Sequence, residues 1–135
     1  MIGFLQGTVF QIEEESVILN VRGVGYELLC SQNTIDAIEG RDVVQVLVHT
    51  HVLEDLIQLF GFNTAAEKQL FLSLIKVNGI GPKMAIKILS AVHLELLVEM
   101  IDAGDVKSLV KLPKVGKKTA EQIILSLKGK LVMDE

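Results

Sequence analysis

The sequence has few of the features that stabilise small secreted proteins or anchor membrane proteins. Its 135 residues include a single cysteine, Cys30, so no disulfide can form within the chain. No apolar run approaches the roughly 20 residues that a membrane-spanning helix needs, and the opening MIGFLQGTVF lacks the basic flank and long hydrophobic region of a signal peptide. Half of the residues are apolar, enough to bury a core, so we expect a folded cytoplasmic protein with no membrane partner.

Aromatic residues and catalytic constellations are also scarce. The chain has no tryptophan and one tyrosine, which argues against a platform for stacking single-stranded bases. His49 and His51 alternate along an expected strand, a spacing that can bind a metal ion, but no cysteine or nearby third ligand accompanies them. No Ser/His/Asp, Cys/His or paired-carboxylate set has a setting suited to catalysis. We therefore expect no catalytic residues, no metal and no cofactor.

Charge is unevenly divided along the chain, although the whole carries a formal net charge of −4. Residues 1–62 hold two arginines and nine carboxylates, a net −7, whereas residues 63–135 hold eleven lysines and eight carboxylates, a net +3. Residues 105–130 alone hold seven lysines and two carboxylates, a net +5. This asymmetry indicates that a polyanionic partner would bind the second half.

The first half has the pattern of a small β-barrel. Short apolar runs divided by glycine or acidic turns predict strands over residues 2–11, 16–21, 25–30, 42–50 and 56–62. Gly23 and Gly25 bracket an expected hairpin, and residues 34–39 can form one helical turn. The arrangement is compatible with a five-stranded Greek-key barrel over residues 1–62.

At residues 62–64 the apolar period changes from two to about 3.6, and we place a domain boundary there, with an all-α domain over residues 63–135. Thr64 and Glu67 have the form of a capping box that opens a helix to about Val77. Further helices are predicted over residues 82–91, 93–101, 105–111 and 117–128, with Gly104 and Gly129 as stops. The fold class is therefore β + α in two domains. Two apolar stripes are most simply core: Leu70, Leu74 and Val77, then Leu94, Leu97 and Ile101.

The helical half contains a partial internal repeat. The segment VNGIGPKMAIKIL at residues 77–89 recurs 35 residues later as LPKVGKKTAEQII. Five positions match in type: Val77 with Leu112, Ile80 with Val115, Gly81 with Gly116, Lys83 with Lys118, and Ala85 with Ala120. A lone Gly-x-Gly usually only caps a helix, but doubling at a fixed offset favours a binding role. We call residues 78–83 the first turn and residues 113–118 the second turn.

Each turn has the chemistry of a phosphate-binding site. Glycine lets the backbone turn tightly and approach a ligand, while the central Ile80 or Val115 can tuck between two helices. Because each turn leads into a helix N-terminus, several main-chain N–H groups lack intrahelical partners and the helix dipole favours an anion. Lysines at a helix start are unfavourable for the helix alone and make sense beside a phosphate. The candidate residues are Asn78, Gly79, Ile80, Gly81, Pro82 and Lys83, and Lys114, Val115, Gly116, Lys117, Lys118 and Thr119.

Other motifs with glycine and lysine do not fit these turns. A Walker motif needs glycine where Lys111 stands and a hydroxyl residue where Lys118 stands. A dinucleotide fingerprint needs a third glycine where Met84 stands, and a preceding strand. Helical solenoids can have a similar period, but two copies are too few.

At this point the residues resemble a known family. The two turns are similar to helix-hairpin-helix motifs, which hold DNA through its phosphates without reading the base sequence. The whole chain resembles the RuvA family of bacterial Holliday junction proteins. The matching segments are Met1-Ile2-Gly3, Gly23-Val24-Gly25-Tyr26-Glu27, Glu54-Asp55 before Leu59-Phe60-Gly61-Phe62, Leu74-Ile75-Lys76 before Asn78-Gly79-Ile80-Gly81-Pro82-Lys83, and Leu109-Val110-Lys111-Leu112-Pro113 before Gly116-Lys117-Lys118-Thr119-Ala120-Glu121.

The resemblance implies an OB-fold barrel followed by a tandem helix-hairpin-helix domain, assembled as a homotetramer or octamer that holds a four-way junction open in a square. It implies a non-enzymatic DNA-binding subunit of an ATP-driven branch-migration complex, acting in recombination, repair and the SOS response. Its partners would be junction DNA, a RuvB-type hexameric ATPase and a RuvC-type resolvase. The family's third domain, which contacts the ATPase, has no counterpart in these 135 residues.

The resemblance also places an acidic pin, Glu54 and Asp55, at the junction centre. Two adjacent carboxylates would repel phosphates, and four copies around an axis would disfavour continuous duplex while tolerating a junction whose strands diverge there. Without the resemblance, a solvated turn between strands would be the simpler interpretation.

Two positions depart from the family pattern. Lys114 stands where the first turn has Gly79 and where the family usually has glycine. If this position needs a positive φ, lysine costs roughly 1–2 kcal/mol, so we expect the second turn to be reshaped, with the ammonium replacing some main-chain contact. Leu53 replaces a basic residue that often precedes the acidic pair, which puts an auxiliary phosphate contact there in doubt.

Two other classes of protein remain open from the residues. A duplex-holding fragment of a repair nuclease or ligase would have a catalytic domain elsewhere and would form no stable tetramer. A helical protein-interaction module would tolerate Lys83→Glu or Lys118→Glu without loss of function.

Overall fold

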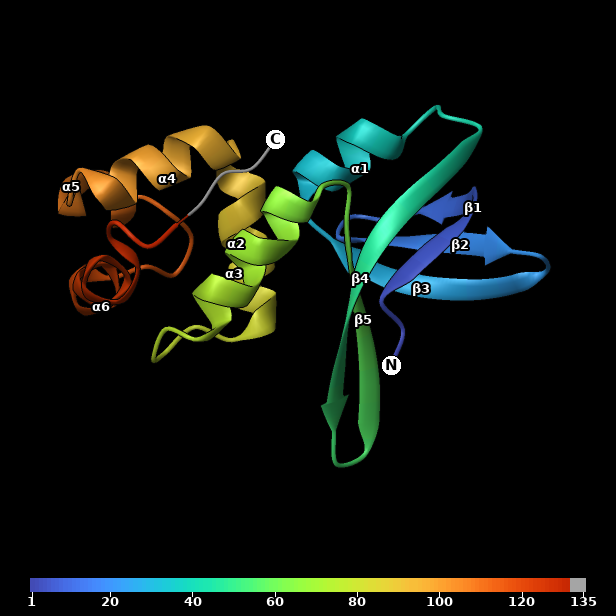
Figure 1. Cartoon of the computed structure of the whole chain (residues 1–135), viewed down its shortest axis with the longest axis horizontal. Helices are drawn as coiled ribbons and strands as arrows, with labels where there is room; N and C mark the ends of the chain where they lie inside the picture. The colour runs from blue at the N-terminus through green and yellow to red at the C-terminus, as the bar shows by residue number, and fades with distance from the viewer. Residues whose placement is uncertain (132–135) are drawn as a thin grey trace. The chain divides into compact units, whose positions relative to one another are not determined.

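The computed structural model describes residues 1–131 of the chain (Figure 1). It divides into two compact units, Met1–Lys68 and the residues from Gln69 onward. No helix within the described part is long and apolar enough to cross a membrane.

The first unit is a closed barrel of five strands. They are β1 (Phe4–Ile12), β2 (Ser16–Val21), β3 (Val24–Cys30), β4 (Val43–Leu53) and β5 (Leu56–Phe62), in the order β1-β2-β3-β5-β4. Neighbours are antiparallel except β3 and β5, which run parallel and pair over only three residues of each strand, Leu28 to Cys30 with Leu59 to Gly61. A helix between the third and fourth strands completes the arrangement of an OB fold, which confirms the predicted fold of this half.

Strand bounds differ from the prediction where pairing continues or stops. β2 and β5 have the predicted limits, but β4 runs on to Leu53 because it keeps pairing with β5 to the end of the hairpin. The hairpin between β2 and β3 turns at Arg22 and Gly23, which both have positive φ, as a tight two-residue turn requires. Gly25 lies in β3 opposite Asn20, as the predicted strand over 25–30 requires.

The barrel core closes over helix α1 (Gln32–Ile38). Its N-cap is Ser31, whose Oγ accepts a hydrogen bond from the Thr34 backbone N–H at 3.2 Å. Alternate residues of the strands point inward and pack with the buried residues of α1. The buried cluster consists of Leu5, Val17, Leu19, Leu28, Cys30, Ile35, Ile38, Val44, Val46 and Val48.

A buried carboxylate joins α1 to the start of α2 (Ala65–Ile75). Ser31 Oγ donates to Glu67 Oε2 at 2.5 Å, and the Thr34 hydroxyl donates to Glu67 Oε1. Thr34 Oγ1 in turn accepts from the Asn63 backbone N–H at 3.0 Å. The first helical turn of α2 therefore belongs to the barrel unit, and the division between the two compact units falls after Lys68, inside α2.

The same carboxylate modifies the predicted capping box. The Glu67 backbone N–H donates to Thr64 Oγ1 at 3.1 Å, as a capping box requires. The Glu67 side chain is nearly fully buried and bonds Ser31 and Thr34. The local sequence thus predicted the backbone half of the capping box. The Glu67 carboxylate finds its partners in the buried hydroxyls of Ser31 and Thr34.

Replacing Thr34 by valine tests this network. Valine has nearly the same shape but removes both the donor to Glu67 and the acceptor for the Asn63 N–H, leaving buried polar groups unpaired. We expect Thr34→Val to lower the free energy of unfolding by about 1–3 kcal/mol, measured by urea denaturation. Thr8→Val, at an exposed threonine of β1, should change it by less than about 0.5 kcal/mol. Equal effects of the two substitutions would refute a stabilising role for the network.

The lone cysteine is part of the core. Burial, and then the charge of the Glu67 carboxylate, raise the pKa of the Cys30 thiol to about 12. The thiol therefore stays protonated at neutral pH, where a thiolate would be needed for reactivity.

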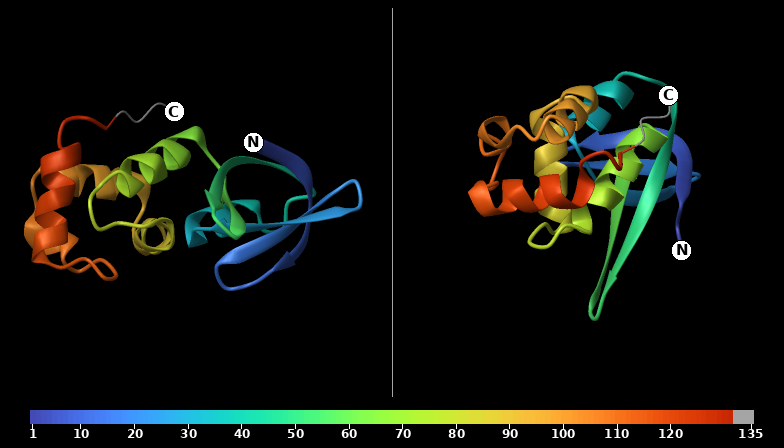
Figure 2. Two further views of the ribbon diagram at one scale, coloured as in Figure 1. Left: turned by 90° about the horizontal axis from the view of Figure 1, so that it is seen from below. Right: turned by 60° about the vertical axis from the view of Figure 1, so that its left-hand side comes forward.

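The second unit is helical, as predicted. After the remainder of α2 it contains α3 (Pro82–Ala91), α4 (Leu94–Asp102), α5 (Val106–Leu109) and α6 (Lys117–Leu127), of which α4, α5 and α6 pack together (Figure 2). Gly104 and Gly129 follow α4 and α6 with positive φ, which confirms both as helix stops. The predicted apolar stripes are buried except for Leu94, which is half-exposed.

Two helices begin later than predicted because the expected first residue is a cap. His93 is the N-cap of α4, and Asp105 is the N-cap of α5. The predicted helix over 105–111 is thereby reduced to the four residues of α5. The Asp105 side chain accepts from the Ser108 backbone N–H at 3.1 Å and from the Ser108 hydroxyl at 2.7 Å.

Candidate nucleic-acid interface

The first turn joins α2 to α3 through a short chain of backbone hydrogen bonds. The Val77 N–H donates to Leu74 O at 3.0 Å, and the Ile80 N–H donates to Val77 O at 3.1 Å. Gly79 has φ +94°, a conformation that L side chains rarely adopt. The chain then reaches α3 at Gly81, the N-cap, which has extended backbone and no side-chain cap.

The second turn joins α5 to α6 with the same bonds, each displaced by 35 residues. The Leu112 N–H donates to Leu109 O at 3.0 Å, and the Val115 N–H donates to Leu112 O at 3.2 Å. Gly116 is the N-cap of α6, again extended and without a side-chain cap. The two turns thus have the same pattern of backbone hydrogen bonds. Asn78 of the first turn corresponds to Pro113 of the second.

Lys114 adopts the conformation that Gly79 adopts in the first turn. Its φ is +61°, and Arg22 is the only other described non-glycine residue with positive φ. The expectation that lysine would reshape the second turn is therefore wrong, because the hydrogen bonds match those of the first turn. Lys114 instead adopts the left-handed conformation, at the energetic cost that this has for a residue with a side chain.

Replacing Lys114 by glycine should relieve that strain. We expect Lys114→Gly to raise the free energy of unfolding by about 0.5–1 kcal/mol, since the left-handed cost disappears while glycine adds unfolded-state entropy. Lys107→Gly, inside α5, should lower it by about 1 kcal/mol. Urea denaturation of both variants measures the difference. A loss of stability in Lys114→Gly as large as in Lys107→Gly would show that position 114 is not strained.

The candidate residues fall into two groups by their exposure to solvent. Most are exposed: Asn78, Gly79, Gly81, Lys83, Lys114, Gly116, Lys117 and Lys118, with Pro82 and Thr119 half-exposed. Ile80 and Val115 are buried, so they position the turns and are not available to a ligand. An added Cβ would meet no atom within 4 Å at Gly79, Gly81 or Gly116, so these backbones border open space.

The starts of α3 and α6 have similar backbone geometry and similar lysine positions. The Ala85 N–H donates to Gly81 O and the Ala120 N–H donates to Gly116 O, which are the first bonds of their helices. The N–H groups before Ala85 and Ala120 lie in the first helical turn of α3 and of α6, where a helix has no internal acceptor for them. Lys83 and Lys118 hold matched exposed positions there. An exposed cation beside such amides can hold a phosphate oxygen.

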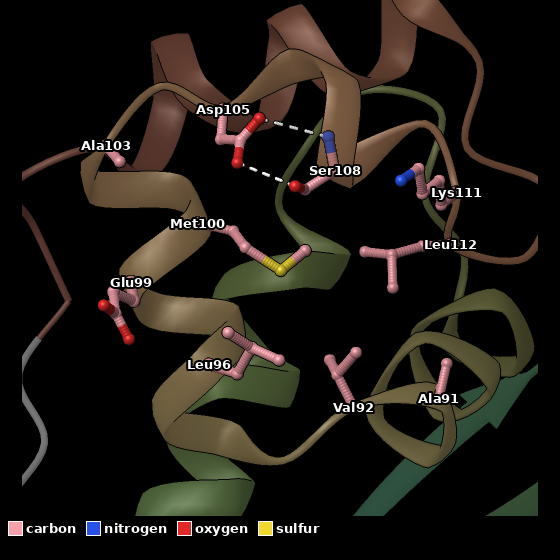
Figure 3. Close-up of a pocket in the computed structure, with 10 residues that line it drawn as sticks. All are labelled: Ala91, Val92, Leu96, Glu99, Met100, Ala103, Asp105, Ser108, Lys111 and Leu112. Atoms are coloured by element: carbon pink, nitrogen blue, oxygen red, sulfur yellow. Dashed lines mark hydrogen bonds between the residues drawn. The ribbon is translucent and has the colours of Figure 1, made fainter.

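Two further lysines follow from the repeat and lie outside the predicted set. Lys76 and Lys111 are also 35 residues apart, both exposed, and their N–H groups donate to Ser73 O and Ser108 O. Extending the comparison of the two copies a few residues upstream would have included them. Lys111 also borders a pocket of about 430 Å³ beside Leu96, Met100 and Asp105 (Figure 3).

Asp105 faces this pocket as a helix cap, as Figure 3 shows. The hydroxyl and N–H of Ser108 lower the pKa of its carboxyl, and the charges of Lys111 and Lys107 add to this. The carboxylate therefore stays ionised and bonded to α5.

The acidic pair lies at the tip of a projecting hairpin. Before Leu59, β5 pairs with β4 alone, so residues 51–58 form a two-stranded segment that extends from the barrel (Figure 1). We call this segment the ribbon. Glu54 and Asp55 are its two turn residues, between the paired Leu53 and Leu56, and both are exposed.

The two histidines pack with an aromatic ring. The centroids of His49 and His51 lie 6.4 and 6.3 Å from that of Phe60, on one face of β4 and β5. Burial, then the charges of His51 and Lys68, lower the pKa of His49, so its imidazole is neutral at pH 7. Within residues 1–131, no group of three His, Cys, Asp or Glu side chains is placed to hold a metal ion.

Comparison with known proteins finds one family model for each half of the chain. Residues 1–61 match the family model of the RuvA N terminal domain, and residues 71–129 match that of the SAM-like Helix-hairpin-helix tandem. The chain is 56% identical over 138 residues to the Holliday junction branch migration complex subunit RuvA of Bdellovibrio bacteriovorus, covering 100% of this chain and 70% of that protein.

Two proteins of the same name show lower identity. The one from Acinetobacter baumannii strain ACICU is 48% identical and the one from Acinetobacter baylyi is 45% identical, each over 130 residues. Both alignments cover 96% of this chain and 65% of the relative. The chain thus spans about two thirds of the length of these relatives.

Proposed function

The chain belongs to the RuvA family, and from this premise we propose that it binds four-way (Holliday) DNA junctions without reading base sequence and holds them for branch migration. It acts as a DNA-binding subunit and catalyses no reaction itself. The observation that carries the proposal is the doubled turn, with matched backbone, matched lysines and open space around its glycines.

Binding through these turns is electrostatic and independent of sequence. Main-chain N–H groups at the starts of α3 and α6, with Lys83 and Lys118, contact phosphate oxygens, which are alike at every nucleotide. Each neutralised phosphate releases counterions, so log K should fall by roughly 0.9 per contact for each tenfold rise in salt. Lys114 and Lys117, where the first turn has Gly79 and Pro82, give the second turn the larger share of this charge.

The acidic pin supplies the selectivity for junctions. Glu54 and Asp55 project on the ribbon, where their carboxylates repel the backbone of a continuous duplex. A four-way junction has strands that diverge at its centre and leave room for such a tip. Attraction at the turns and repulsion at the tip together favour a junction over its arms.

The assembly follows from family membership. We propose a homotetramer or octamer in the cytoplasm that works with a RuvB-type hexameric ATPase in recombination and repair, and with a RuvC-type resolvase. We assign contacts with the ATPase to no residue of this chain. Four symmetric copies bring four acidic tips and eight turns to one junction.

A gel-shift titration with the purified chain tests the proposal. It compares an immobile four-way junction with each of its isolated arms at the same salt concentration, and sedimentation gives the mass of the free protein. We expect a clear preference for the junction, with similar affinity for junctions of unrelated sequence. Equal affinity for junction and arms would refute junction selectivity, and a monomeric mass would refute the tetramer.

A further inference from the structure

Four exposed aliphatic side chains surround the acidic pair on the ribbon. Val52 and Ile57 are 64% and 65% exposed, and Leu53 and Leu56 are 45% and 47% exposed. They follow one another directly along the chain on both sides of Glu54 and Asp55. Apolar groups gathered on a projecting segment mark an interaction site more often than scattered ones do.

The aliphatic residues form two cross-strand pairs on opposite faces of the ribbon. Leu53 pairs with Leu56, and Val52 pairs with Ile57. Successive residues of a strand point to opposite faces, so one pair lies on each side. One such pair could serve only to stabilise the hairpin. Apolar pairs on both faces are expected of a segment that has a partner on each side.

The adjacent carboxylates restrict what that partner can be. Glu54 and Asp55 repel phosphates within about a Debye length, roughly 10 Å at 0.1 M salt, so the sugar-phosphate backbone is an unfavourable neighbour for the tip. The flat faces of bases are uncharged and can pack against aliphatic side chains. In an open four-way junction the last base pair of each arm exposes one face towards the centre.

We propose that the ribbon tip is an apolar wedge, in which the pairs Leu53–Leu56 and Val52–Ile57 cover the exposed faces of the base pairs that border the junction centre. The inference rests on the proposed junction binding and deepens it. The carboxylates keep the phosphates apart, and the aliphatic side chains replace the stacking that the bases lose when the junction opens. Leu53, where the family often has a basic residue, then contacts bases in place of a phosphate.

A fluorescent base tests the wedge. 2-Aminopurine is placed either in the base pair next to the crossover or in the middle of an arm of an immobile junction, and quenching by acrylamide measures its exposure to solvent. Acrylamide is neutral, so the carboxylates do not exclude it. The proteins are the wild-type chain, Val52→Thr/Ile57→Thr and Leu53→Gln/Leu56→Gln. The matched control is Val43→Thr, the same change on the same strand at 52% exposure.

We expect the central probe to be shielded in the wild-type complex and about two- to threefold more quenchable with either double variant. Affinity for the junction should fall roughly tenfold, with little change for the arms, since each variant loses two partly covered aliphatic side chains. Val43→Thr should match the wild type, and the mid-arm probe should not distinguish the proteins. Thermal unfolding checks that the variants are folded. The difference in quenching between the central and mid-arm probes in the wild-type complex tests the wedge without any variant.

Three results would overturn the wedge. Equal quenching of the central probe with the wild type and both double variants, at intact junction preference, would refute it while leaving the proposed function in place. A change in oligomeric mass of the variants with unchanged quenching would assign the aliphatic pairs to contacts between copies. If the wild type does not prefer the junction over its arms, the proposed function and the wedge fail together.

Discussion

Lys83→Glu combined with Lys118→Glu is expected to lower the affinity for a four-way junction by on the order of 100-fold or more near 0.1 M salt. The two lysines hold matched positions at the starts of α3 and α6, so the pair of changes removes one cation from each turn of every copy. The glutamates also place negative charge where phosphates should lie. Each lost contact should make the slope of log K against log salt shallower by about 0.9.

The matched control for this variant is Lys107→Glu combined with Lys130→Glu. These lysines are exposed and lie outside both turns, and the change in net charge is the same. A filter-binding titration at several salt concentrations compares the two variants. If both lose the same affinity, binding depends on overall charge and not on the turns. If Lys83→Glu/Lys118→Glu binds the junction like the wild type, the two turns do not form the contact with DNA.

Neutralising the acidic pin should have the opposite effect on duplex DNA. We expect Glu54→Gln combined with Asp55→Asn to tighten binding to plain duplex by about tenfold, with a smaller gain for the junction, so that junction preference falls. The side chains keep nearly the same shape, and the ribbon backbone should not change. The effect should shrink as salt rises, because exposed charges are screened.

The control for the pin is another adjacent pair of carboxylates. Glu13 and Glu14 are exposed in the turn between β1 and β2, and Glu13→Gln/Glu14→Gln removes the same charge from the same barrel. Competition between labelled junction and unlabelled duplex measures the preference for all three proteins. Loss of preference in the control would indicate a general charge effect, and an unchanged preference in the pin variant would remove the proposed role of the tip.

Local sequence signals predicted the helices and turns of this fold well where neighbouring residues alone decide the backbone conformation. Gly104 and Gly129 end helices because their backbones have positive φ, and the 35-residue repeat gave two turns with the same hydrogen bonds. The OB fold was predicted from short apolar runs and from the resemblance together. Periodicity alone cannot supply the parallel pairing of β3 with β5 that closes the barrel.

The errors arose where distant residues decide the structure. The Glu67 side chain leaves its local cap for Ser31 and Thr34, which lie more than 30 residues earlier in the chain. β4 extends to Leu53 because β5 offers partners there, which no feature of β4 itself reveals. At Lys114 the local rule favours glycine, and the surrounding bonds impose the left-handed backbone on lysine anyway.

The candidate site was predicted in outline from the sequence. The lysines and glycines of the turns are exposed, and Ile80 and Val115 are buried, as expected of residues that tuck between two helices. The exposed aliphatic pairs beside Glu54 and Asp55 were not recognised. Val52 and Leu53 lay beyond the end of the predicted strand over 42–50, so their pairing with Leu56 and Ile57 could not be foreseen.

The left-handed residue in the second turn bears on how this protein can evolve. A main-chain amide is present whatever side chain the residue carries, so a contact made through amides survives most substitutions that preserve the backbone path. Position 114 shows that even a glycine site can exchange its residue when neighbouring bonds hold the path. A change of side chain at the tip of such a turn would therefore alter the local charge, while the backbone path and the amides that it presents stay in place.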